Sequence, residues 1–74
     1  MSKLPVLSGR ELVRALDKLG YRLDRQRGSH MILRHESPPH RRLVVPDHDP
    51  IARGTLRAII REAGLTAEEL IELL

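Results

Sequence analysis

The chain has 74 residues, a formal net charge of +3 at pH 7 and no cysteine. This length fits one domain over residues 1–74, and the lack of cysteine excludes a disulfide framework and a thiolate zinc site. The apolar stretches are short and interrupted by arginine, far from the roughly 20 residues of a membrane span. Because the N-terminus also lacks a secretory apolar segment, we expect a cytoplasmic protein.

Charge is unevenly distributed along the chain. Between residues 22 and 42 there are six arginines and two acidic residues, whereas the segment after Arg61 has four glutamates and no basic residue. A basic middle segment favours a polyanionic partner, and arginine grips phosphate through paired hydrogen bonds. The alternative is that the arginines reflect a high-GC genome and an ordinary solvated surface.

The first predicted element is a helix over residues 9–19. Ser8 and Glu11 have the spacing of a capping box, leucines recur at positions 12, 16 and 19, and Gly20 provides a C-terminal stop. A strand over residues 21–27 follows, in which simple alternation places Tyr21, Leu23 and Arg25 on one face.

The next residues predict a hairpin. Gly28-Ser29 fits a two-residue type II′ turn, and a second strand runs from position 30 to position 35. The connection Ser37-Pro38-Pro39-His40 ends that strand because proline cannot donate to a sheet ladder. A third strand is predicted over residues 42–45, ended by Pro46, with a polar loop over residues 47–50.

A second helix is predicted to open at Gly54-Thr55 and to end at Gly64. Its apolar stripe contains Leu56, Ile59, Ile60 and Ala63, and its basic stripe contains Arg53, Arg57 and Arg61. A second capping box, Thr66 with Glu69, predicts a short terminal helix. The fold class is therefore α+β, in the order α-β-β-β-α with a short extra C-terminal helix, which resembles the double-stranded-RNA-binding fold in topology.

Several short segments occur in a particular order along the chain: Ser8-Gly9-Arg10-Glu11, Leu19-Gly20-Tyr21, Gln26-Arg27-Gly28-Ser29-His30, Val44-Val45-Pro46-Asp47-His48, Gly54-Thr55-Leu56-Arg57-Ala58-Ile59-Ile60-Arg61 and Ala63-Gly64-Leu65. Together they are similar to the HicA toxin family, also called YcfA-like, over nearly the whole chain. The connection over residues 37–40 departs from this resemblance, because it looks longer and stiffer than in many members.

The resemblance implies a function. HicA-type proteins are toxins of prokaryotic type II toxin–antitoxin systems; they are small ribonucleases that cut mRNA, and a cognate HicB antitoxin silences them. Their fold is double-stranded-RNA-binding-like, and the histidine of the Gly-Ser-His motif is required for toxicity. That histidine corresponds to His30 in this chain.

The residues themselves allow metal-independent RNA cleavage. RNA carries its own nucleophile, the 2′-hydroxyl, so one histidine and nearby arginines suffice to move a proton and stabilise charge on phosphorus. As a general base His30 would contribute roughly 10²–10⁴-fold in rate. The general acid stays open among His35, His40, His48 and water. The competing interpretation is that a lone histidine at a strand start is a surface or structural residue, and that the chain is a noncatalytic RNA-binding or antitoxin-binding module.

The position of the turn predicts the RNA contacts, namely Arg25, Arg27, Gly28, Ser29 and Arg34. The basic stripe of the second helix is either a solvated face or a contact for nucleic acid or antitoxin. Tyr21 is the sole aromatic residue, so base preference should be weak and binding should depend strongly on salt. No histidine pair has metal-ligand spacing, and we expect neither a metal nor another cofactor.

Overall fold

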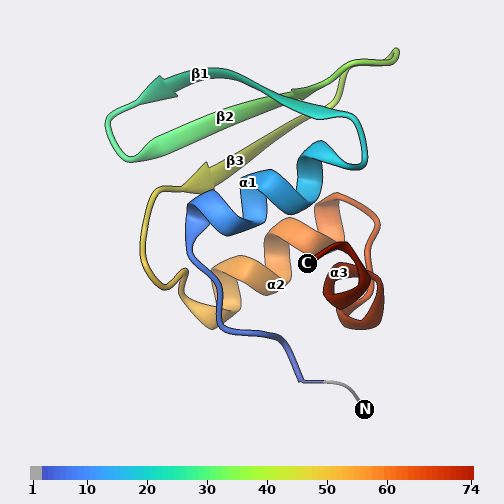
Figure 1. Ribbon diagram of the computed structural model, residues 1–74. Helices are drawn as coiled ribbons and strands as arrows, with labels where there is room; N and C mark the ends of the chain where they lie inside the picture. The colour runs from blue at the N-terminus through green and yellow to red at the C-terminus, as the bar shows by residue number, and fades with distance from the viewer. Residues whose placement is uncertain (1–2) are drawn as a thin grey trace.

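The computed structural model describes residues 3–74 and has the order α-β-β-β-α-α (Figure 1). The helices are α1 (Gly9–Asp17), α2 (Arg53–Glu62) and α3 (Ala67–Leu73). The strands are β1 (Tyr21–Arg27), β2 (His30–His35) and β3 (Arg42–Pro46), which form one antiparallel sheet in the order β1-β2-β3. The predicted α+β class and its extra C-terminal helix are confirmed.

Two capping boxes fix where helices begin. Ser8 Oγ accepts a hydrogen bond from the backbone N–H of Glu11 at 3.1 Å, and Glu11 Oε1 accepts one from the backbone N–H of Ser8 at 3.0 Å. Thr66 and Glu69 repeat this exchange at the start of α3. Both caps satisfy N–H groups that have no partner within the helix, so these helices start where the sequence predicts.

Three predicted boundaries are wrong by one or two residues. Helix α1 ends at Asp17 rather than at position 19, because residues 18–20 form a turn that closes on Gly20 at φ +96°. Strand β3 includes Pro46, which pairs with the first residue of β2. Helix α2 starts at Arg53, one residue before Gly54, and has no side-chain cap.

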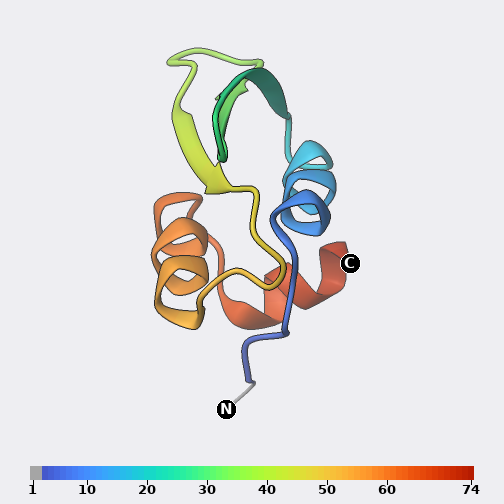
Figure 2. The same cartoon turned by 90° about the vertical axis from the view of Figure 1, so that its left-hand side faces the viewer.

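The helices cover only one face of the sheet. Figures 1 and 2 show all three on the same side, with α1 and α2 beneath the strands and α3 beside α1. The buried apolar residues between these layers are Leu7, Leu12, Ala15, Leu16, Tyr21, Met31, Leu33, Leu43, Val45, Ile51, Leu56, Ile59, Ile60 and Leu70. The face of the sheet that points away from this core, called here the open face, has none of the described helices on it.

Strand β1 contains one extra residue relative to β2. Leu23 pairs with Leu33 and Arg25 pairs with Ile32, so Asp24 has no partner of its own and forms a β-bulge. Paired residues in an antiparallel ladder share a face, and Ile32 alternates with the buried Met31. Arg25 therefore lies on the open face, and the predicted alternation, which put it with Tyr21, is wrong beyond the bulge.

Gly9 allows α1 to approach the end of β3. Its backbone N–H donates to the carbonyl oxygen of His48 at 2.8 Å, and a Cβ atom at this position would collide with the carbonyl oxygen of Pro46. Gly54, the second residue of α2, has no other atom within 4 Å of the place where a Cβ would lie. Both glycines thus lie in the first turn of a helix, but Gly9 is tightly packed and Gly54 is not.

This contrast predicts opposite effects of alanine. Gly9→Ala should lower the free energy of unfolding by about 1–3 kcal/mol, because the new methyl group forces backbone segments apart. Gly54→Ala should raise it by about 0.4–1 kcal/mol, because the helix loses less backbone entropy on folding. Urea unfolding followed by circular dichroism measures both, and equal values for the two variants would contradict the close approach at Gly9.

Candidate functional site

His30 lies at the start of β2 and points away from the core. It pairs with Arg27 of β1 and with Pro46 of β3, and it is exposed to solvent. The next residue, Met31, is buried against the helices, so alternation along the strand directs the His30 imidazole to the open face. A substrate group that reaches this imidazole must therefore approach from the open face.

The open face is a grid of three rows across the strands. Its rows are Arg27-His30-Pro46, Arg25-Ile32-Val44 and Arg22-Arg34-Arg42. Directly opposed Cβ atoms in such a ladder lie about 4.5–5.5 Å apart and diagonal neighbours somewhat farther. Arg27 is thus directly beside His30 and Arg25 is diagonal to it, so the three side chains can reach one phosphate group.

The arginines near His30 differ from Arg22 in their ion pairing. Arg22 bonds to Asp17 Oδ1 at 2.9 Å and to Glu36 Oε1 at 3.1 Å, so its charge is neutralised within the protein. Within residues 3–74, the structure shows no ion pair for the other arginines of the open face, which are Arg25, Arg27, Arg34 and Arg42. Their guanidinium groups are available to an external anion.

The turn that precedes His30 has the predicted backbone. Gly28 has φ +57°, and Ser29 does not share a positive φ, which is the φ pattern of a type II′ turn. A Cβ at Gly28 would meet no atom within 4 Å, so glycine is required here by backbone conformation and not by lack of space. The surface beside the turn is accordingly open.

A set of hydrogen bonds anchors this turn to the rest of the fold. The backbone N–H of Asp47 donates to the Ser29 carbonyl oxygen at 2.6 Å, and Gln26 Nε2 donates to the Gly28 carbonyl oxygen at 3.0 Å and to Asp47 Oδ2 at 3.3 Å. Arg10 of α1 donates from Nε to Asp47 Oδ1 at 3.2 Å and from Nη2 to Asp47 Oδ2 at 3.0 Å. Asp47 therefore joins α1, β1 and the turn.

The Asp47 carboxylate is held ionised by these contacts. The hydrogen bonds from Arg10, followed in importance by the one from Gln26, lower the pKa of Asp47 from its ordinary value of 3.8. Sequence reasoning missed this anchor, although Arg10, Gln26 and Asp47 all lie in the segments that carry the family resemblance. Arg10 and Asp47 are 37 positions apart, and no local pattern signals such a pair.

Two of the other histidines have structural roles. His35 Nε2 lies 2.7 Å from the Leu19 carbonyl oxygen, and its ring packs edge-on against Tyr21 with centroids 4.8 Å apart. His40 Nδ1 lies 3.1 Å from the His35 carbonyl oxygen. His35 ends β2, about 17 Å from His30 for a strand of this length, and His40 lies next to it in the connection to β3. Of the predicted candidates for the general acid, His35 and His40 are therefore too far from His30. His48 and water remain as candidates.

The predicted RNA-binding residues divide into two groups. Arg25, Arg27 and the turn residues Gly28 and Ser29 surround His30, whereas Arg34 lies in the far row, about 13 Å along β2. The basic stripe of α2 is exposed on the helical side of the molecule, where Arg53 and Arg57 line a hollow with Leu4, Ile60 and Ala67. The stripe is thus separate from the grid that contains His30.

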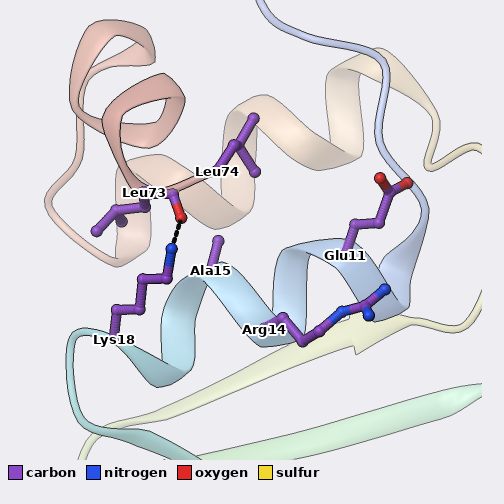
Figure 3. Close-up of a pocket in the computed structure, with 6 residues that line it drawn as sticks. All are labelled: Glu11, Arg14, Ala15, Lys18, Leu73 and Leu74. Atoms are coloured by element: carbon purple, nitrogen blue, oxygen red, sulfur yellow. Dashed lines mark hydrogen bonds between the residues drawn. The ribbon is translucent and has the colours of Figure 1, made fainter.

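A hollow of about 310 Å³ lies within the helical layer, between α1 and the end of α3, and His30 is not among the residues that line it. There Lys18 Nζ donates to the Leu73 carbonyl oxygen at 2.5 Å (Figure 3). It is lined by Glu11, Arg14, Ala15, Lys18, Leu73 and Leu74. In residues 3–74 no group of three or more histidine, aspartate or glutamate side chains is placed to hold a metal ion.

The sequence matches a family described as the HicA toxin of bacterial toxin–antitoxin, over residues 9–65. This chain belongs to that family. The matched region contains α1, the whole sheet, the turn with His30 and α2. A search of curated proteins found no match. None of the helices in the described part of the chain is long and apolar enough to cross a membrane.

The Asp47 anchor predicts a specific acid response. A carboxylate whose pKa is lowered by folding stabilises the fold above its ordinary pKa, and that stabilisation is lost as the pH falls below about 3.8 toward the folded pKa. Asp47→Asn should therefore lower the free energy of unfolding at pH 7 and make its decline between pH 4 and pH 2 (about two units) shallower.

Asp49→Asn is the matched control, because Asp49 lies in the same loop and, among residues 3–74, makes no ion pair. Urea unfolding across this pH series should give the control the same slope as the natural sequence. A slope that changes equally in both variants would show that Asp47 has no special role.

Proposed function

We propose that this HicA-family protein is a metal-independent endoribonuclease that cleaves mRNA, with His30 as the proton-transfer group. The observation that supports this most is the position of His30, an exposed imidazole directly opposite Arg27 and diagonal to Arg25, neither of which has an ion pair within residues 3–74. Family membership supports the toxin role. With mRNA as the substrate, the proposed site of action is the cytoplasm.

The proposed reaction uses the chemistry of RNA itself. His30 accepts the proton of a 2′-hydroxyl group, whose oxygen forms a bond to the adjacent phosphorus. The bond between phosphorus and the 5′-oxygen then breaks, and that oxygen takes a proton from a general acid. The products are a 2′,3′-cyclic phosphate and a 5′-hydroxyl end, with no metal or other cofactor consumed.

Arginine supplies the electrostatic part of this reaction. Negative charge builds up on the nonbridging oxygens as phosphorus becomes five-coordinate, and guanidinium groups already directed at that position stabilise it. Arg27 is directly opposite His30 in the ladder, and Arg25 is its diagonal neighbour. The anchored turn keeps these groups in register, because the Gly28 and Ser29 carbonyl oxygens are both bonded to other parts of the fold.

Replacement of His30 separates catalysis from binding. His30→Ala should reduce RNA cleavage by about 10²-fold or more and should abolish growth arrest on induced expression, because general base catalysis is lost. Salt-dependent RNA binding should persist, because the arginines remain. Purified protein assayed with single-stranded RNA in excess chelator measures cleavage, and end analysis of the fragments should show 5′-hydroxyl groups.

His48→Ala is the informative companion variant. If His48 is the general acid, this variant should cleave RNA more slowly, and its rate should no longer fall at alkaline pH. If the dependence of the rate on pH is unchanged, water is the general acid. Activity that chelator abolishes and zinc or magnesium restores would contradict the proposal. An unchanged phenotype of His30→Ala would instead favour a noncatalytic RNA-binding or antitoxin-binding module.

We also propose that a HicB-like antitoxin silences the protein by covering the open face around His30. Toxin–antitoxin family membership supports the existence of an antitoxin partner. A surface with four arginines that have no ion pair within residues 3–74 attracts an acidic partner strongly, and a partner bound there would block substrate access to His30.

Hydrogen exchange of the complex with the antitoxin tests this placement. Protection should increase over residues 25–35, most at the turn and at β1, because β1 is an edge strand while the amides of β2 already lie between two strands. The free protein under the same conditions is the reference. Protection confined to the acidic segment after Arg61 would mean inhibition at a distance and would exclude a steric block.

A further inference from the structure

We propose that single-stranded RNA lies along the open face of the sheet, from His30 at the turn to Arg34 and Arg42 in the far row. The unpaired bases contact Ile32 and Val44 between these two basic rows. This assignment rests on the proposed ribonuclease function and specifies where its substrate runs and that it is single-stranded. The observations that support it are the residue pairs of the grid and the ion pairs of the fold.

The direction of His30 limits the path of the substrate. A phosphate group at the imidazole must stand on the open face, because the other face of the sheet is covered by α1 and α2 (Figure 2). Arginines of the helical layer, such as Arg14 and Arg57, lie on other surfaces. The neighbouring phosphates of the same strand therefore meet the arginines of the grid first.

The far row contains like charges that the fold leaves uncompensated. Arg34 is directly opposite Arg42, and like charges in this position destabilise a sheet. The third arginine of the row, Arg22, is neutralised by Asp17 and Glu36, whereas neither Arg34 nor Arg42 has an ion pair among residues 3–74. An external polyanion would remove this repulsion, and the phosphates of an RNA strand supply that charge.

The middle row separates the two basic rows with aliphatic surface. Val44 is 51% exposed and pairs with Ile32, which is half-buried. Bases turn away from solvent and pack on such a surface only when they are unpaired, because a duplex presents its phosphates outward. The only Phe, Tyr or Trp residue, Tyr21, is buried in the core, so the described open face has no large aromatic platform besides the His30 imidazole and base preference should be weak.

Binding measurements in the His30→Ala background test the path without cleavage of the probe. The probe is a fluorescein-labelled single-stranded RNA of mixed sequence, titrated at several salt concentrations, with the same sequence as a duplex for comparison. Arg34→Ala and Arg42→Ala should weaken binding and should each reduce the slope of log affinity against log salt by about 0.7. Val44→Ser should weaken binding with the slope unchanged, and the duplex should bind less tightly than the single strand.

Arg14→Ala and Arg57→Ala are matched controls, because each removes one exposed positive charge from a helix. Both should keep the affinity and the salt slope of the background protein. Loss of binding in these controls, with Arg34→Ala and Arg42→Ala unaffected, would place the RNA on the helical layer and overturn the proposal. The Arg42 and Val44 variants could instead keep their RNA affinity and lose the ability to bind the antitoxin. That result would make the open face a protein interface and would also overturn the proposal.

The failure of this path is distinguishable from failure of the nuclease proposal. If the natural sequence cleaves RNA but the grid variants bind normally, the path is wrong and the activity stands. If the grid variants lose binding as expected while the natural sequence cleaves no RNA, the path stands and the nuclease assignment is wrong.

Discussion

The unpaired residue Asp24 determines which side chains share a face with His30. Without this bulge, strict alternation would turn Arg25 and Arg27 toward the helices and Gln26 toward solvent. With it, Arg25 and Arg27 lie beside His30, and Gln26 reaches Asp47 on the other side of the sheet. One inserted residue therefore produces both the basic surroundings of His30 and the Gln26 contact that anchors the turn.

The candidate site combines a solvent-exposed imidazole with a fixed backbone. His30 gains no support from burial, so its position depends on the residues that precede it. Asp47 holds the Ser29 carbonyl through its backbone and binds Arg10 of α1 through its side chain, while Gln26 holds the Gly28 carbonyl. Solvent access for a long polymer and precise placement of the imidazole are thus supplied by different parts of the molecule.

Local patterns in the sequence were sufficient for most of the fold. Ser8 and Thr66 mark helix starts through side-chain contacts three residues away, and Gly28 marks a turn through a positive φ that glycine adopts without strain. The bulge at Asp24 and the Arg10–Asp47 pair were not predictable, because each depends on how distant segments meet. The prediction of which sheet face Arg25 occupies was consequently wrong, and Arg42 was absent from the predicted RNA contacts.

The ion pairs of the fold explain why a modest net charge can produce a strongly basic face. Arg10 and Arg22 belong to the basic population of the chain, yet both are neutralised by carboxylates of the protein. Four arginines of the open face have no such partner within the described residues, so this face keeps a positive potential, as does the separate Arg53, Arg57 and Arg61 stripe of α2. An RNA strand and an acidic antitoxin would then compete for one set of guanidinium groups. In such competition the bound antitoxin would inhibit the toxin by keeping RNA away from the open face. No change in the conformation of the toxin would be needed.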